Sequence, residues 1–229
     1  MSDRIKVKSL KEGKIEKHYF FPNRRELRQT LIEMGFLPPD AEEMVGPFAM
    51  TAEGKLAFYY EIFSLNQRRQ RKRLVYHLGS FLVEEEDKTF YANVKTQDKL
   101  PISIFSPKRA LQSDTVVLTA GMENYLAVYA MTEKSHVAAV PHAGFALKNP
   151  TVLSWLFKDE EIRRVVLAFP KSQKQYQKEL AQVLKKRGFQ VETLDYEGES
   201  PYEHYQLSVN RMLEQAMEQL DVVSPDNGV

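Results

Sequence analysis

Residues 114–131, DTVVLTAGMENYLAVYAM, contain a short apolar run, a glycine and a longer segment with helical apolar spacing. The run Val116–Thr119 predicts a buried strand, because strands that are covered on both faces are apolar at successive positions. Gly121 marks the turn after that strand, and residues 122–131 follow as a predicted helix. This order predicts the first strand and helix of a βαβ arrangement.

The same alternation of strand and helix continues toward the end of the chain. The further predicted elements are a strand at 136–140, a helix at 150–157, a strand at 163–169, a helix at 171–187, a strand at 189–194 and a helix at 205–220. Strands and helices that alternate at this spacing form a parallel sheet flanked by helices. The sequence therefore predicts an α/β domain over residues 111–229, with a frayed tail from residue 221.

Residues 1–110 predict a smaller α+β region before that domain. Its predicted elements are a hairpin of residues 5–10 and 14–21, helices at 23–35 and 38–44, and strands at 55–63 and 74–83. The polar segment 66–73 is predicted as a loop between the last two strands. A continuous helix across residues 55–94 is the competing interpretation, since their apolar residues are compatible with either structure.

Basic and acidic residues almost cancel, 32 Lys and Arg against 31 Asp and Glu, which leaves a net charge of +1. Binding to nucleic acid therefore depends on local patches, since the whole chain does not attract anions. The absence of cysteine excludes disulfides, cysteine-ligated metals and thiol catalysis. The chain starts without the apolar run of a signal peptide, and no stretch approaches the roughly 18 consecutive apolar residues of a membrane span. We expect a cytoplasmic protein without a membrane partner.

Several segments follow one another in a recognisable order in the second half of the chain. They are Val116–Ala127, Val165–Lys171, Lys185–Val191 and Glu197–Pro201, preceded by the weaker Tyr91–Asn93 and Pro101–Leu111. In order and spacing they resemble a Toprim domain, which occurs in bacterial DNA primases, topoisomerases and related nucleases. The resemblance covers about residues 88–206. It implies a Toprim-like parallel sheet and a role in DNA handling.

The chain departs from the Toprim pattern at the residues that hold metal. The family places a glutamate before the glycine of the first segment and an Asp-x-Asp pair in the second, and these carboxylates bind Mg²⁺. Here Ala120 stands at the glutamate position, Asn124 replaces a following acid, and Phe169-Pro170-Lys171 occupy the Asp-x-Asp region. These side chains do not form a cage for a hard cation. The resemblance therefore implies a site without catalytic residues, metal or cofactor.

The helix predicted at 171–187 carries a row of lysines where the family would place acids. Lys171, Lys174, Lys178 and Lys185 fall within roughly 60° of one another on a helical projection. One interpretation is an electropositive edge that binds nucleic-acid phosphates. The other is an ordinary solvated lysine face. Lys171 and Lys174 oppose the helix dipole at the start of the helix, which favours a functional role.

Two further features are candidates for ligand contact. The run Arg68, Arg69, Arg71, Lys72 and Arg73 places five cations within six positions. Such a run repels itself, so it faces either solvent or an anion such as phosphate. His142 follows Pro141 at the end of a predicted strand, where open α/β sheets bind ligands. Together with Gly121 and Asn124 it defines the predicted cleft.

Three functions follow from these residues and remain open at this point. The first is a non-catalytic nucleic-acid-binding or accessory protein, acting with replication proteins or in the DNA handling of a mobile element. The second is a metal-dependent nuclease or primase with a rearranged site made of Glu123 and the acids of residues 195–204. The third is a scaffold for protein interactions. The replication and mobile-element context rests on family analogy alone.

The arginine run generates a first testable prediction. Changing Arg69, Arg71 and Arg73 to alanine removes three cations, so oligonucleotide affinity should fall equally for all sequences and its dependence on salt should flatten. Binding titrations at several salt concentrations measure both quantities. An affinity and a salt slope equal to those of the wild type would leave this run as a solvated loop.

Overall fold

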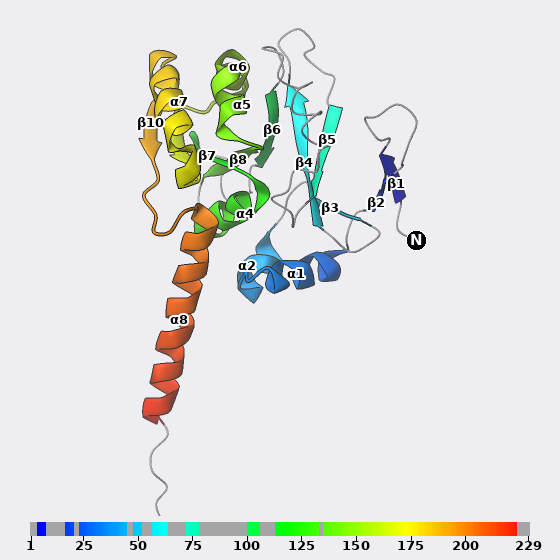
Figure 1. Cartoon of the computed structure of the whole chain (residues 1–229), viewed down its shortest axis with the longest axis vertical. Coiled ribbons are helices and arrows are strands. Elements are labelled where there is room, and N and C mark those ends of the chain that lie inside the picture. The colour runs from blue at the N-terminus through cyan, green and yellow to red at the C-terminus, as the bar shows by residue number, and fades with distance from the viewer. Residues whose placement is uncertain are drawn as a thin grey trace, which may run out of the picture.

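The described residues of the computed structural model are 4–7, 17–20, 23–44, 48–51, 56–63, 72–77, 100–105, 113–132 and 135–223. Their ten strands form one sheet in the order β1-β2-β3-β4-β6-β8-β7-β9-β10, with β5 paired to β4 (Figure 1). The strands are β1 (Arg4–Val7), β2 (Lys17–Phe20), β3 (Phe48–Thr51), β4 (Leu56–Phe63), β5 (Lys72–His77), β6 (Leu100–Phe105), β7 (Thr115–Ala120), β8 (His136–Val140), β9 (Arg164–Ala168) and β10 (Gln190–Thr193).

The described helices are α1 (Arg24–Glu33), α2 (Pro38–Glu43), α4 (Met122–Met131), α5 (Ala143–Lys148), α6 (Pro150–Asp159), the 3-10 turn η2 (Lys171–Gln173), α7 (Lys174–Lys186) and α8 (Pro201–Val223). Within the described ranges, no helix is long and apolar enough to cross a membrane.

The second half of the chain forms the predicted α/β sheet. β8, β7, β9 and β10 are parallel to one another, and β6 pairs with β8 in the antiparallel direction. α4 connects β7 to β8, α5 and α6 connect β8 to β9, and η2 and α7 connect β9 to β10. The predicted fold class, a mostly parallel sheet flanked by helices and preceded by an α+β region, is therefore confirmed.

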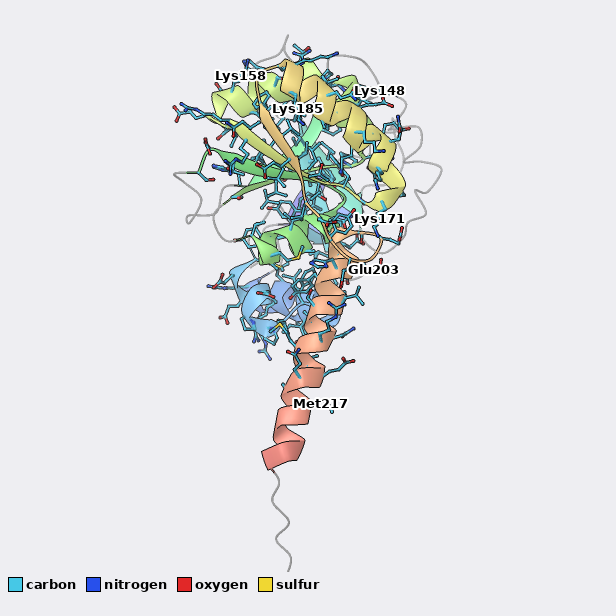
Figure 2. The ribbon with its side chains drawn as sticks, turned by 90° about the vertical axis from the view of Figure 1, so that its left-hand side faces the viewer. Lys148, Lys158, Lys171, Lys185, Glu203 and Met217 are labelled. Atoms are coloured by element: carbon cyan, nitrogen blue, oxygen red, sulfur yellow. The ribbon has the colours of Figure 1, made fainter. Side chains whose placement is uncertain are left out.

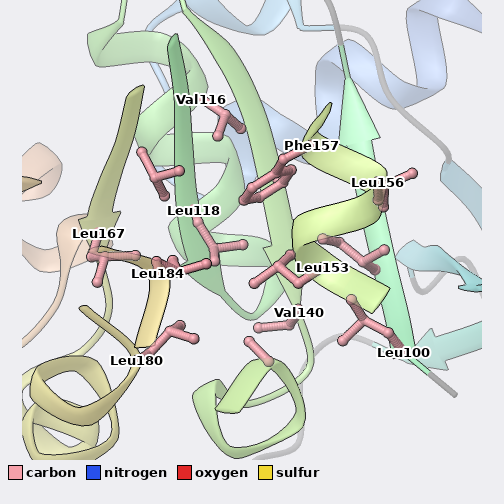
Figure 3. Close-up of a cluster of buried hydrophobic side chains, with 14 of the residues drawn as sticks. Leu100, Val116, Leu118, Val140, Leu153, Leu156, Phe157, Leu167, Leu180 and Leu184 are labelled. Carbon is pink, nitrogen blue, oxygen red and sulfur yellow. The ribbon is translucent and has the colours of Figure 1, made fainter. Parts of the chain in front are cut away.

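Helices cover the parallel strands on both faces, which explains their continuous apolar runs. Successive residues of a strand point to opposite faces, so Val116 and Leu118 contribute to one core and Val117 to the other. The first of these cores lies beneath α5, α6 and α7, where Leu153, Leu180 and other labelled side chains meet those of the strands (Figure 3). The second core lies beneath α4 and the start of α8.

The core beneath α4 also joins the two halves of the chain. The Phe58 ring of β4 lies 4.9 Å from the Tyr125 ring of α4, measured between centroids. Phe36, which follows α1, lies 4.9 Å from the Tyr205 ring of α8. All four side chains are buried. Aromatic pairs at such distances add to the stabilisation from burial, so this cluster fixes β4 and α1 against helices from the other half.

The predicted elements of the first half are confirmed within the described residues. β1 and β2 pair in antiparallel fashion as a hairpin, and α1 begins at a capping box in which Asn23 and Glu26 bond each other's backbone. β4 and β5 are antiparallel strands, so the competing helix across 55–94 is wrong for the part of it that is described. Lys72 and Arg73 belong to β5 rather than to the predicted loop, because both pair with β4.

Several elements differ from the prediction. The prediction missed β3, β6 and α5, which are four to six residues long and too short to show a periodicity. Lys171 lies in η2, one turn before α7, because its backbone N–H bonds the carbonyl oxygen of Glu199. α8 begins at Pro201 instead of residue 205 and extends to Val223. The boundary predicted between residues 110 and 111 stays a prediction.

The first turns of α8 are bonded to the connection between α1 and α2 and to α2 itself. The Tyr202 hydroxyl donates to the Met34 carbonyl, and the Tyr205 hydroxyl donates to the Asp40 carboxylate. Tyr205 also accepts the Leu37 N–H at 3.0 Å, and the Gln206 amide donates to the Gly35 carbonyl at 3.1 Å. Burial, followed by the hydrogen bond to Asp40, raises the pKa of Tyr205 well above its usual range. The tyrosine is therefore a neutral donor here.

Gly35 generates the second prediction. Its φ of +88° disfavours side chains, and a Cβ there would lie 2.6 Å from Gln206 Oε1. Gly35→Ala should cost about 1–2 kcal/mol for the backbone and about 1 kcal/mol more for the displaced Gln206 bond. Denaturant titrations of the variant and the wild type measure the difference in their free energies of unfolding.

Gly188→Ala is the matched control, since Gly188 has a φ of +93° and nothing within 4 Å of its Cβ position. It should show the backbone cost alone. Equal losses for the two variants would contradict a structural role for the Gln206 contact.

Candidate nucleic-acid interface

The carboxyl ends of the parallel strands meet around Gly121. This glycine follows β7 and precedes α4 with a φ of +80°, and its N–H bonds the Val140 carbonyl of β8 at 3.0 Å. On the other side of β7, the Thr119 hydroxyl donates to the Ala168 carbonyl of β9 at 2.5 Å. The predicted strand-to-helix turn beside the end of the 163–169 strand is therefore confirmed.

Asn124 uses both ends of its amide to hold this turn. Its Nδ2 donates to the Ala120 carbonyl at 2.8 Å, and its Oδ1 accepts the Tyr202 N–H at 3.1 Å. The side chain is buried. Asn124 therefore connects the β7–α4 turn to the first turn of α8, and its polar atoms are satisfied within the fold.

The region after β9 is also closed by internal bonds. Phe169 is buried, its N–H donates to Gln177 Oε1 at 3.1 Å, and its carbonyl accepts the Tyr196 hydroxyl. Burial, with a smaller effect of the Glu199 charge, raises the pKa of Tyr196 to about 12. The backbone at this position is thus paired with α7 and with the loop after β10.

The acids near this edge are dispersed or already paired. Burial raises the pKa of the Glu123 carboxyl from its ordinary value. In the loop before α8, Glu197 forms an ion pair with Arg211 at 2.6 Å, and Glu203 accepts the Glu199 N–H at 2.5 Å. Among the described residues, no three His, Asp or Glu side chains are grouped so that they could hold a metal ion.

This donor set does not fit the Mg²⁺ that a Toprim resemblance implies. Mg²⁺ requires oxygen ligands in near-octahedral geometry, with carboxylates carrying the charge. The positions where the sequence departs from the Toprim pattern supply the methyl group of Ala120, the engaged amide of Asn124 and the buried ring of Phe169. The Glu123 carboxylate lies beside Gly121, with Oε2 3.9 Å from its Cβ position, but it is not joined there by two further metal-ligating side chains among the described residues. No catalytic step is therefore derived through a metal.

Three lysines lie in η2 and the first two turns of α7, which follow the carboxyl end of β9. Lys171 Nζ lies 3.8 Å from Glu199 Oε1, in an ion pair whose side chains are 47% and 77% exposed. Lys174 and Lys178 are exposed on α7 itself. Lys185 lies at the opposite end of the helix from Lys171 (Figure 2). The structure thus brings together Lys171, Lys174 and Lys178, with Lys171 partly neutralised by its neighbour.

His142 has a structural role that the sequence analysis did not anticipate. It caps α5, with Nδ1 accepting the Gly144 N–H at 3.0 Å, and its ring packs edge-on against Tyr176 at 5.0 Å. Burial, followed by repulsion from Lys148, lowers the pKa of the imidazole. His142 lies at the same edge as Gly121, but its acceptor nitrogen is used within the fold.

The arginine run is only partly described. Arg68, Arg69 and Arg71 lie outside the described residues, and so does the phosphate contact predicted for them. Lys72 and Arg73 are placed by the backbone pairing of β5 with β4. The structure therefore does not connect this run with the edge around Gly121.

Sequence reasoning missed the glutamines and the tyrosine that close this edge. Gln173 accepts the Ala143 N–H at 2.7 Å, while Gln177 and Tyr196 bond the backbone of Phe169. Gln177 lies three and seven residues before Leu180 and Leu184, so a helical projection places it on the buried face of α7. The projection shows positions on one element only, so it does not reveal the hydrogen bond to Phe169.

Comparison with known proteins gives a low level of similarity. No family model and no curated protein matches the chain. Among solved structures, the primase fragment of the bacteriophage T7 primase-helicase protein has a TM-score of 0.46 and 14% identity, over 80% of this chain and 72% of that one. A structure of bacteriophage T7 lagging-strand DNA polymerase interacting with primase domains bound to an RNA/DNA hybrid has a TM-score of 0.45 and 15% identity, over 80% and 88% of the two chains. Similarity at this level assigns the chain no family and no activity.

Asn124 generates the third prediction. Asn124→Asp restores an acid at this position, but it places a carboxylate oxygen against the Ala120 carbonyl in place of a donor. The variant should lose about 1–3 kcal/mol of stability at pH 7. The folded-state pKa of the new acid should be raised, so the loss should appear as pH rises above about 4 and shrink below it, where a protonated carboxyl can donate.

Thermal melts at pH 4 and pH 7 measure this effect. Asn210→Asp is the control, because Asn210 is exposed on α8 and should change stability by less than about 0.5 kcal/mol. Equal melting temperatures for Asn124→Asp and the wild type at pH 7 would contradict the assigned hydrogen bonds.

Proposed function

We propose that this protein binds nucleic acid without metal-dependent catalysis, through a Toprim-like domain whose metal-binding acids have been lost. The observation that carries the proposal is the position of Lys174 and Lys178. Both are exposed on α7, beside the carboxyl end of β9, where a Toprim domain would present acids with bound Mg²⁺. Ammonium groups at this edge would contact a phosphate directly instead of through a metal.

The lysines would supply affinity without sequence recognition. An ammonium group acts as a point charge on phosphate and carries no information about the base. The N-terminus of α7 adds the partial positive charge of the helix dipole, which also attracts a phosphate. Lys171 would contribute less than Lys174 or Lys178, since Glu199 already lies 3.8 Å from its Nζ.

The nuclease or primase alternative is less well supported by the residues. Its acids would be Glu123 and those of residues 195–204. Glu197 and Glu199 are ion-paired with Arg211 and Lys171, and Glu203 accepts a backbone N–H. Assembling a cation site from them would require breaking these contacts and paying the cost of desolvating each carboxylate.

An accessory role with replication proteins, or in the DNA handling of a mobile element, is part of this proposal. It rests on the Toprim resemblance of the sequence. A protein-interaction scaffold would have the same fold but no salt-dependent affinity for oligonucleotides. Binding measured at several salt concentrations separates these two functions, because phosphate contacts release counterions.

The fourth prediction concerns the charge of α7. Lys174→Glu with Lys178→Glu should weaken binding to single- or double-stranded oligonucleotides at least tenfold at moderate salt, which corresponds to about 1.4 kcal/mol. The melting temperature should stay the same or rise, because a glutamate in the first turn of a helix favours its dipole. Fluorescence anisotropy and thermal melts measure the two effects.

Lys185→Glu with Lys186→Glu is the matched control. It makes the same change of charge on the same helix, roughly 15 Å away from Lys174 and Lys178 along the axis. If both double variants lose affinity equally, the binding depends on overall charge and not on this edge. A wild-type protein that binds no oligonucleotide at low salt would leave the chain as an interaction scaffold.

A further inference from the structure

The second half of α8 extends beyond the body of the protein. Figure 1 shows the helix leaving the sheet and its covering helices and continuing alone. Val209 is buried, at 7% exposure, whereas all residues from Asn210 to Met217 are exposed. Arg211, paired with Glu197 at 2.6 Å, marks the point where the helix leaves the body.

A helix of this length gains little stability by itself. Isolated helices shorter than about 12–15 residues are marginal in water, and most helices in proteins are stabilised by packing of an apolar face. Residues 210–223 form about four turns, and apart from the Arg211–Glu197 ion pair the described part of the chain leaves residues 210–217 exposed. The protruding part of α8 therefore needs a partner surface to be stable.

The protruding part carries the kind of face that such packing requires. Met212, Leu213 and Met217 are 58%, 52% and 65% exposed. By helical register they lie within an arc of about 140°, together with positions 216, 220 and 223. The same arc includes Val209, which is buried against the body. The apolar stripe is thus a continuation of the face with which α8 already packs.

The polar residues on either side of the stripe differ in charge. Asp221 and Glu214 follow one edge of the stripe, whereas Gln219 and Gln215 follow the other. No charge lies at either border of the apolar stripe. Met217 and Asn210 form one border, and Met212 and Gln219 form the other. In helix pairs such flanking positions decide which partner and which orientation is accepted.

We infer that the apolar stripe of α8 pairs with the same stripe of a second copy of this chain, in parallel orientation. In a parallel pair, the acidic edge of one helix faces the glutamine edge of the other. In an antiparallel pair, acidic edge faces acidic edge, and like charges repel. Because the borders of the stripe are uncharged, an identical chain can pair with it, and no basic partner is required. This inference does not depend on the proposed binding of nucleic acid.

The expected dimer is weak. A two-helix seam of this length buries on the order of 1,000 Å² in total, at the lower limit of specific interfaces. We expect a dissociation constant in the micromolar range, because association and the ordering of exposed side chains offset much of the gain from so small an interface. The helix should become more ordered on pairing, so the far-ultraviolet circular dichroism signal should grow with protein concentration.

Sedimentation equilibrium of the whole chain, from low to high micromolar concentration, is the first part of the test. Leu213→Asp should raise the dissociation constant of the dimer at least tenfold, because it places a charge in the seam. Leu213→Met is the control, since it keeps an apolar side chain of similar volume at the same position and should leave the dimer intact. Leu213 is exposed in the monomer, so neither change affects its core.

Disulfide crosslinking is the second part, and the absence of native cysteine makes it unambiguous. Ala216→Cys places a thiol in the seam, where equivalent residues of a parallel pair lie opposite each other. It should give a covalent dimer on mild oxidation, whereas Gln215→Cys should not. A monomeric wild type at high micromolar concentration, or a dimer unaffected by Leu213→Asp, would overturn the inference. A dimer that Ala216→Cys fails to crosslink would overturn the parallel pairing.

Discussion

The continuity of the sheet depends on β6, a strand of six residues. Its first half pairs with β4, through Leu100–Ile102, and its second half pairs with β8, through Ser103–Phe105. Leu100 and Ile102 are completely buried. Without this strand, the antiparallel part and the parallel part would each end in an open edge of unpaired N–H and C=O groups. The placement of α4 over both parts, with Tyr125 against Phe58, follows from that pairing.

The edge around Gly121 is held together by hydrogen bonds within the fold. A carboxylate at position 124 would leave the Ala120 carbonyl without a donor, whereas the asparagine amide bonds both this carbonyl and the Tyr202 N–H. In the same way, the buried Phe169 ring contributes to the core beneath α7 instead of facing a ligand. Exposed polar groups near this edge, within the described residues, include the lysines of α7 and the ion-paired acids before α8.

The parallel half could be predicted because burial on both faces leaves a clear trace in the sequence. Runs such as Val116–Thr119 and His136–Val140 are apolar at successive positions and are separated by helices. β6 left no such trace, since Pro101 argues against a strand and the pairing partners lie far away in the chain.

The candidate site was predictable only in part, for a related reason. In the sequence, Gly121 is recognisable as a turn residue, and the lysines are recognisable by their helical spacing. The roles of Asn124 and Gln177 depend on backbone groups of other elements, with which they share no sequence pattern. The bond of His142 to Gly144 is local, but histidine is not among the common N-cap residues. A hydrogen bond between distant segments has no period along the chain, so neither helical nor strand periodicity reveals it.

The bonds of Tyr202, Tyr205 and Gln206 have a mechanical consequence. They clamp the base of α8 to α2 and to the connection that precedes it, while Asn124 ties the same base to the β7–α4 turn. The protruding end of the helix is a lever arm whose pivot is this clamp. A force on the protruding end of α8 therefore acts directly on the first half of the chain and on the strand ends around Gly121. Few residues separate the load from the turn at Gly121, and all of them are held by bonds to backbone atoms.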